Sequence, residues 1–120
     1  MKKIIEIEGK EIPFVSNGAT LRIYRNEFKR DMLHDLVKLQ KYKTEEELVE
    51  NFDYSIIENL AYICAKTADS NIPDTIEEWL GQFNDLMSLY SKMNDIISIL
   101  NSSQVAIVQS KKKIVKKAKK

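Results

Sequence analysis

The stretch Ile5-Glu6-Ile7-Glu8-Gly9-Lys10-Glu11-Ile12-Pro13-Phe14 decides how the fold begins. Apolar and charged residues alternate on both sides of Gly9-Lys10, and a period of two is typical of strands that bury one face. Gly9-Lys10 is expected to supply the turn between the two strands. Pro13 has no amide hydrogen to donate, which favours an edge position for the second strand. The sequence therefore predicts an N-terminal β-hairpin.

The residues after the hairpin follow a helical period instead. Asn17-Gly18 ends the second strand, and Thr20 is expected to cap a helix that continues to about Gln40, with apolar residues every three or four positions. Three later helix starts carry the capping-box pattern, a hydroxyl residue followed three positions later by a glutamate. These pairs are Thr44 with Glu47, Ser55 with Glu58, and Thr75 with Glu78.

The last two helical segments are expected to differ in burial. The segment 55–68 is rich in apolar residues and is predicted to be the central helix. The segment from Thr75 to about Leu100 is expected to bend or split near Gly81, a weak helix former. Together these patterns predict an α+β fold, mainly α. It has an N-terminal β-hairpin, about four helical segments in a single domain over residues 1–101, and a flexible Lys-rich tail over 102–120.

Charge is divided unevenly along the 120 residues. The formal net charge is +1, and seven of the last ten residues are lysine, so residues 1–110 carry −6. The apolar run near the N-terminus is only Ile4-Ile5, too short for a signal peptide or membrane span. The lone Cys64 allows no intrachain disulfide, which fits a reducing compartment. These features predict a cytoplasmic protein that does not bind a membrane.

Residues that could carry catalysis are few. His34 is the sole histidine and has cationic neighbours one helical turn away, which favours a solvated surface position. Cys64 falls among apolar residues and is expected to be structural. The acidic run Glu45-Glu46-Glu47 is expected to stabilise the first turn of a helix rather than bind a metal ion. We therefore expect no enzyme activity, cofactor or metal site.

Aromatic and basic residues offer two candidate contact surfaces. Trp79 and Phe83 lie one helical turn apart, as do Tyr24 and Phe28, and each pair belongs either to the core or to a groove that anchors a partner. Arg22, Arg25 and Lys29 form a basic ridge beside the second pair, which is either a solvated face or a contact surface. The candidate partner-binding residues are Arg22, Tyr24, Arg25, Phe28, Lys29, Trp79 and Phe83.

Three segments of the chain resemble a known family. The opening Ile5-Glu6-Ile7-Glu8-Gly9-Lys10-Glu11-Ile12-Pro13-Phe14, then Thr20-Leu21-Arg22-Ile23-Tyr24-Arg25, then Asn71-Ile72-Pro73-Asp74 with Glu78-Trp79-Leu80 and Phe83 occur in the order found in tail assembly chaperones of long-tailed phages and prophages of Gram-positive bacteria. The chain departs from the family pattern at Leu21, often proline there, and at Lys29, often glycine.

The resemblance implies a function in virion assembly. Such chaperones bind the tape measure protein, keep it soluble, help recruit tail tube subunits, and are absent from the mature virion. Self-association is left open by the sequence. The resemblance also implies a longer form made by a ribosomal frameshift, for which the lysine codons of 111–113 offer an adenine-rich tract.

The Lys-rich tail supports an alternative function. Seven lysines in ten residues could attract nucleic acid, which would make the chain a nucleic-acid-binding phage accessory protein. The tail has no aromatic residues to stack on bases, and the acidic body opposes the attraction. Solubilisation, or a consequence of the coding sequence, also accounts for the lysines, so we do not expect nucleic acid as the main partner.

Overall fold

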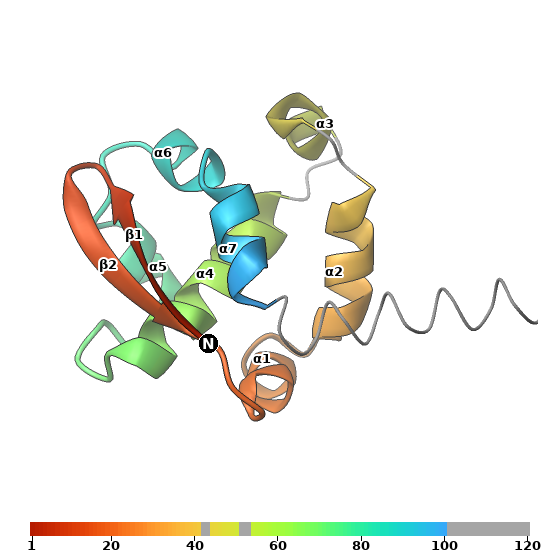
Figure 1. Ribbon diagram of the computed structural model, residues 1–120, viewed down its shortest axis with the longest axis horizontal. Coiled ribbons are helices and arrows are strands. Elements are labelled where there is room, and N and C mark those ends of the chain that lie inside the picture. Colours follow the sequence, from red (N-terminus) through yellow and green to blue (C-terminus); the bar gives the residue numbers. More distant parts are fainter. Residues whose placement is uncertain (42–43, 51–53, 101–120) are drawn as a thin grey trace, which may run out of the picture.

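The computed structural model describes residues 1–41, 44–50 and 54–100 (Figure 1). Strands β1 (Lys2–Ile7) and β2 (Lys10–Val15) form an antiparallel hairpin that precedes the helices. The helices are α1 (Thr20–Phe28), α2 (Met32–Gln40), α3 (Glu45–Glu50), α4 (Tyr54–Ala68), α5 (Ile76–Leu80), α6 (Met87–Tyr90) and α7 (Met93–Ile99). The predicted α+β, mainly α class is confirmed. The tail expected over 102–120 lies outside the described residues.

The hairpin buries one of its two faces. Ile5 and Ile7 of β1 and Phe14 of β2 point into the core, whereas Ile4 on the opposite face is 58% exposed. Ile5 lies opposite Ile12 in the register, as the alternating pattern requires. The predicted hairpin is thus confirmed.

The turn differs by one residue from the sequence-based prediction. Glu8 and Gly9 occupy the two turn positions with φ values of 54° and 79°, while Lys10 already pairs with Ile7. Positive φ at both central residues is the geometry of a type I′ turn, which matches the right-handed twist of the strands. The prediction that Gly9-Lys10 forms the turn was therefore wrong. The twist of the two strands favours a turn at Glu8-Gly9, the pair that precedes Lys10.

Glu8 adopts its left-handed conformation because its side chain is held from outside the hairpin. Its carboxylate accepts hydrogen bonds from the backbone N–H groups of Asn84 and Asp85, both at 2.9 Å, and from the hydroxyl of Ser88 at 3.1 Å. The two backbone bonds are the main reason why the pKa of Glu8 lies below its usual value. The hairpin tip is thereby fastened to the segment that begins α6.

The helix expected from residue 21 to about residue 40 is two helices. Lys29 ends α1 in the left-handed region, with φ of 56°, and its N–H donates to the carbonyl of Arg25 at 2.8 Å. Asp31 then starts α2 by accepting from the backbone N–H of Leu33 at 2.9 Å. The prediction of one continuous helix was wrong because apolar periodicity continues across the break. Glycine is the favoured residue at a left-handed C-cap, so Lys29 is under strain there.

Two of the expected helix caps are confirmed. The hydroxyl oxygens of Thr44 and Thr75 accept from the backbone N–H groups of Glu47 and Glu78, each at 3.2 Å. Thr75 is the N-cap of α5 in an extended conformation. Each of these contacts satisfies one of the orphan amide groups in the first helical turn.

The other two expected caps were wrong. Thr20 is already helical, and its buried hydroxyl accepts from the N–H of Asn17 at 2.8 Å, ahead of the helix. Ser55 lies inside α4, which is helical from Tyr54 onward. In both cases the sequence signal lies close to a helix start, but the predicted cap residue is itself part of the helix.

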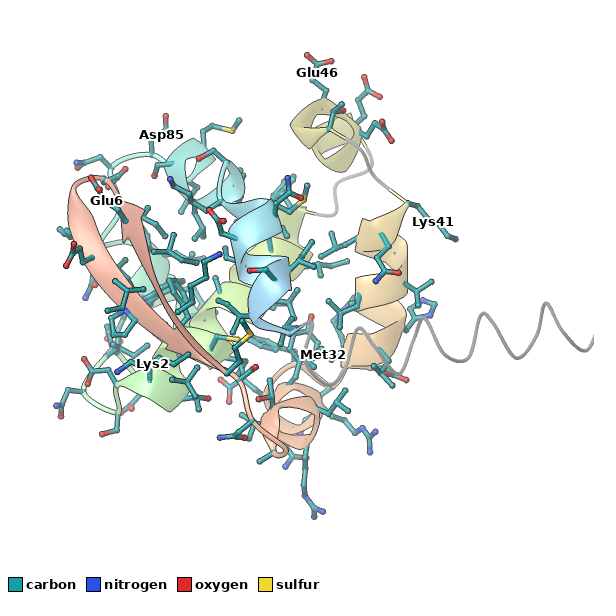
Figure 2. The ribbon with its side chains drawn as sticks, viewed as in Figure 1. Lys2, Glu6, Met32, Lys41, Glu46 and Asp85 are labelled. Carbon is teal, nitrogen blue, oxygen red and sulfur yellow. The ribbon has the colours of Figure 1, made fainter. Side chains whose placement is uncertain are left out.

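Helix α4 is the centre of the core, as predicted. Every residue from Leu60 to Ala65 is buried, and so are Ile56 and Ile57. Strand β2 and helices α1, α5, α6 and α7 all pack against it (Figure 1). By contrast, Figure 2 shows Lys41 and Glu46 pointing away from the body, near the adjoining ends of α2 and α3.

The segment expected over 75–100 splits into α5, α6 and α7, with the first break beginning at Gly81. Helix α7 is fastened to the open end of the hairpin, because the hydroxyl of Ser16 donates to the carbonyl of Ile99 at 2.6 Å. The ammonium group of Lys3 also lies 3.3 Å from a carboxylate oxygen of Asp95. The predicted split is confirmed.

Replacing Lys29 with glycine should stabilise the protein by up to about 1 kcal/mol, because glycine adopts positive φ without the Cβ penalty. The matched control is Arg25→Gly within α1, which should cost roughly 1 kcal/mol. Urea unfolding monitored by circular dichroism would measure both. A destabilising Lys29→Gly would show that the left-handed cap carries no strain.

Candidate functional site

A groove of about 230 Å³ opens beside β2 and is a candidate binding site. One wall is the strand itself, and the opposite wall comes from the end of α4, the loop that follows it, and α5 with its C-terminal extension. The groove is lined by Lys10, Glu11, Ile12, Pro13, Ala65, Asp69, Ile72, Trp79, Gln82 and Phe83.

Aromatic rings hold the helical wall of the groove. The rings of Trp79 and Phe83 meet edge to face, with centroids 5.1 Å apart and planes at 87°. Trp79 is 2% exposed and also contacts the ring of Tyr62 at 5.8 Å, whereas Phe83 is half-buried. Trp79 therefore anchors the wall to α4, and Phe83 presents apolar surface to the groove.

The loop between α4 and α5 is fixed by polar contacts. The hydroxyl of Tyr62 donates to the carbonyl of Pro73 at 2.8 Å, and the ammonium of Lys66 lies 2.8 Å from the carboxylate of Asp74. That hydrogen bond from Lys66 lowers the pKa of Asp74, and the same contact raises the pKa of Lys66. Because Asp74 is fully exposed, the ion pair orients the loop more than it stabilises the fold.

Two acidic residues line the groove, and two more are exposed on α5. Glu11 and Asp69 line it, and Glu77 and Glu78 extend from α5; all four are exposed. Lys10 is the one cation among the lining residues of the groove. The site thus combines an apolar floor with an acidic rim, which favours a ligand that is apolar at its centre and basic at its ends.

A comparison of this chain with protein-family models, curated proteins and solved structures gives no match. Function must therefore be inferred from the chemistry of the surface and from the sequence segments that form it.

The predicted contact residues fall into three structural classes. Tyr24 and Trp79 are core residues, and Phe28 and Phe83 are half-buried at its edge. Arg22, Arg25 and Lys29 are exposed on α1, and none of the three forms an ion pair with another described residue. The structure therefore brings Trp79 and Phe83 together in the groove, while the basic ridge belongs to the surface of a different helix, α1.

Tyr24 is in the core because it satisfies a buried carboxylate. Its hydroxyl donates to Asp35 at 2.7 Å, and the guanidinium of Arg30 donates to both oxygens of the same carboxylate at 2.9 and 2.7 Å. Burial opposes ionisation of Asp35, but the hydrogen bonds from Arg30 and Tyr24 outweigh it and hold its pKa below the usual value. This contact fastens α1 to α2.

Asp35 and Arg30, as well as the groove residues Ile12 and Ile72, were not predicted as functional residues from the sequence. A signal for Asp35 was present, because it lies three residues after Met32 and four before Leu39 on the apolar face of α2. An acid at such a position requires a buried partner. No local signal indicated that Ile12 and Ile72 would line the same groove, because that arrangement depends on tertiary packing.

The two side chains weighed above as catalytic groups lie in different environments. Cys64 is fully buried, and burial raises the pKa of its thiol to about 12, so it stays protonated at neutral pH. His34 is exposed on α2, as predicted. Within the described ranges no group of three or more His, Cys, Asp or Glu side chains is placed to hold a metal ion. No helix among those residues is long and apolar enough to span a membrane.

Removing the hydroxyl of Tyr24 tests the buried carboxylate. Tyr24→Phe should cost about 1.5–3 kcal/mol, because the hydrogen bond to a charged group is lost inside the core. Tyr54→Phe is the matched control, since the hydroxyl of this half-buried tyrosine makes no hydrogen bond within the described residues. Chemical unfolding at neutral pH would compare them, and equal stability of the two variants would contradict the assignment.

The same contact predicts a pH dependence. A carboxyl group whose pKa is lowered on folding stabilises the protein above its unfolded-state pKa of about 4 and loses that contribution as the pH falls further. Stability should thus decrease below pH of about 4, and Asp35→Asn should flatten that decrease while lowering stability at neutral pH. Unfolding curves between neutral and acidic pH would measure both effects.

Trp79→Ala should cost about 3–5 kcal/mol, because it empties a large buried volume against Tyr62 and Phe83. Leu80→Ala, at a half-buried neighbour, should cost less. Thermal unfolding of the two variants would rank them. A Trp79→Ala protein with an unchanged melting temperature would place this side chain outside the core.

Proposed function

We propose that this protein is a tail assembly chaperone that binds an apolar segment of the tape measure protein and keeps it soluble. The observation that carries the proposal is the apolar groove between β2 and α5, in which Phe83 is half-buried above the anchored ring of Trp79. Apolar surface with a charged rim suits the reversible binding of an aggregation-prone client.

The position of the family-like segments supports the proposal. The opening segment, residues 5–14, forms the hairpin and supplies Ile12 and Pro13 to one wall of the groove. The segment 71–83 forms the loop and α5 that supply Ile72 and Phe83 to the other wall. Two segments that are distant in sequence, and that both resemble the family, thus face each other across one groove.

Charge supports the solubilising part of the proposal. Residues 1–110 have a formal net charge of −6, and the groove is lined by the exposed acidic residues Glu11 and Asp69. A complex of this protein with an apolar client would keep these charges in water, which opposes aggregation. The chain acts in the cytoplasm of the bacterial host, without catalysis or cofactor.

The small size of the groove supports release of the client without nucleotide hydrolysis. A site of about 230 Å³ covers only a short part of a long client, so each contact has modest affinity. Tail tube subunits then displace the chaperone as they assemble around the tape measure protein, and the mature virion lacks it. The longer frameshifted form would add its extra residues beyond the described domain.

Co-expression with the tape measure protein from the neighbouring genes tests the function. We expect the client to remain in the soluble fraction only when this chain is present, and to co-purify with it. Gln82→Lys, an exposed substitution on the groove, should reduce the soluble client, because the new charge must be desolvated on binding. Asn94→Lys on the exposed side of α7 is the matched control.

Several outcomes would reject the proposal. The first is a tape measure protein that is equally soluble with and without this chain. If Asn94→Lys and Gln82→Lys reduce the soluble client equally, the groove is not the client site.

Arg25→Glu tests the ridge on α1 separately, and unchanged client binding would exclude that ridge as a contact surface. Arg25 is exposed and forms no ion pair with another described residue, so the Arg25→Glu variant should be nearly as stable as the wild-type protein.

A further inference from the structure

The carboxylate of Glu8 joins the hairpin turn to the link between α5 and α6, which passes beside it (Figure 1). It accepts hydrogen bonds from the backbone N–H groups of Asn84 and Asp85, both at 2.9 Å, and from the hydroxyl of Ser88 at 3.1 Å. We call these three contacts the clasp. Both carboxylate oxygens take part, because one accepts from Asn84 and the other from Asp85 and Ser88.

The clasp lies at one end of the groove. Glu8 stands two residues before Lys10, the first lining residue of the strand wall. Asn84 directly follows Phe83, the last lining residue of the opposite wall. Each wall is thus held within a few bonds of the residues that form it, so the clasp sets the separation between Phe83 and β2 at this end.

The backbone of the second wall changes its support at Phe83. The N–H groups of Gly81, Gln82 and Phe83 donate to carbonyls of α5 and continue the turns of that helix. The next two N–H groups along the chain are those that Glu8 holds. In the described structure the segment 81–86 belongs to no helix or strand. The position of Phe83 is therefore fixed by α5 on one side and by the hairpin on the other.

The conformation of the turn gives no local reason for a glutamate at this position. Glu8 and Gly9 both have positive φ, and asparagine followed by glycine is the favoured pair for such a type I′ turn. Glutamate has a Cβ that disfavours this conformation and no compensating contact with its own backbone. Its side chain, however, offers two acceptor oxygens to two successive N–H groups, whereas asparagine has one and is shorter. The clasp accounts for Glu8 where the turn does not.

We propose that Glu8 is a positioning residue of the groove. Its clasp holds Phe83 at a fixed separation from β2, so the apolar surface is formed before a client arrives. A preformed site avoids the entropic cost of ordering the segment 81–86 during binding, which raises affinity. The effect on client affinity rests on the proposed function, whereas the effect on the shape of the groove does not.

Glu8→Asn separates the clasp from the turn, because it removes the carboxylate and creates the favoured Asn-Gly pair. The melting temperature should change little, while the amides of Asn84 and Asp85 should exchange about tenfold faster or more. Trp79 is the sole tryptophan, and its ring meets the ring of Phe83 edge to face. When Phe83 is released, quenching of the tryptophan fluorescence by acrylamide should increase.

Two further variants complete the experiment. Glu6→Asn removes the same charge from an exposed residue of β1 outside the clasp, and both amide exchange and quenching should stay at their wild-type values. Ser88→Ala removes one of the three contacts and should change both measurements in the same direction as Glu8→Asn, but by less. Titration with the co-expressed and purified tape measure protein should show an affinity about threefold to tenfold lower for Glu8→Asn than for the wild-type chain.

The outcomes separate this inference from the proposed function. Unchanged exchange at Asn84 and Asp85, or faster exchange with unchanged quenching of Trp79, would show that the clasp does not position the groove wall. Equal effects of Glu6→Asn and Glu8→Asn would assign the change to charge. Wild-type client affinity in a Glu8→Asn protein with increased quenching would overturn the role of Glu8 in client binding. A wild-type chain that binds no client would reject the proposed function, and exchange and quenching would still decide whether the clasp shapes the groove.

Discussion

The burial of α4 is the constraint on which the rest of the structure depends. Eight of its side chains, from Ile56 to Ala65, are removed from water, so the helix must be covered on most of its circumference. No single helix can do this, and the hairpin, α1, α5, α6 and α7 each cover a part. The groove beside β2 lies where two of these covering elements, the hairpin and α5, approach each other without closing.

Polar contacts decide how the covering elements are oriented. Glu8 joins the hairpin tip to the start of α6, Ser16 joins the other end of the hairpin to α7, and Asp35 joins α1 to α2 through Tyr24. Apolar burial has no preferred direction, whereas each of these contacts requires a particular geometry. They hold the hairpin in the position in which β2 forms one wall of the groove.

The proposed function depends on one physical property of the molecule. A strand edge that pairs with no further strand among the described residues, next to half-buried Phe83, can bind an extended apolar segment. Pro13 and the charged Glu11 limit that adhesion, because one lacks an N–H group and the other favours water. A chaperone needs this balance, since a client that binds too tightly would not be released to the growing tail.

The sequence by itself determined the elements whose signals are local. Period-two alternation around Gly9, helical periodicity after residue 20 and the hydroxyl cap at Thr75 specify backbone states through neighbouring residues, and the described structure contains all three. The apolar composition of 55–68 also sufficed to identify the central helix, because a helix without a wide polar face must be buried.

Only the tertiary structure decided the break at Lys29, the partner of Asp35 and the position of the groove. Lys29 has a strong helix propensity, yet the contact of Arg30 and Tyr24 with Asp35 turns the chain there. Ile12 and Ile72 line the same groove although many residues separate them in sequence. Periodicity reports which residues are buried but not which distant residues they meet, because that choice is made by packing around α4.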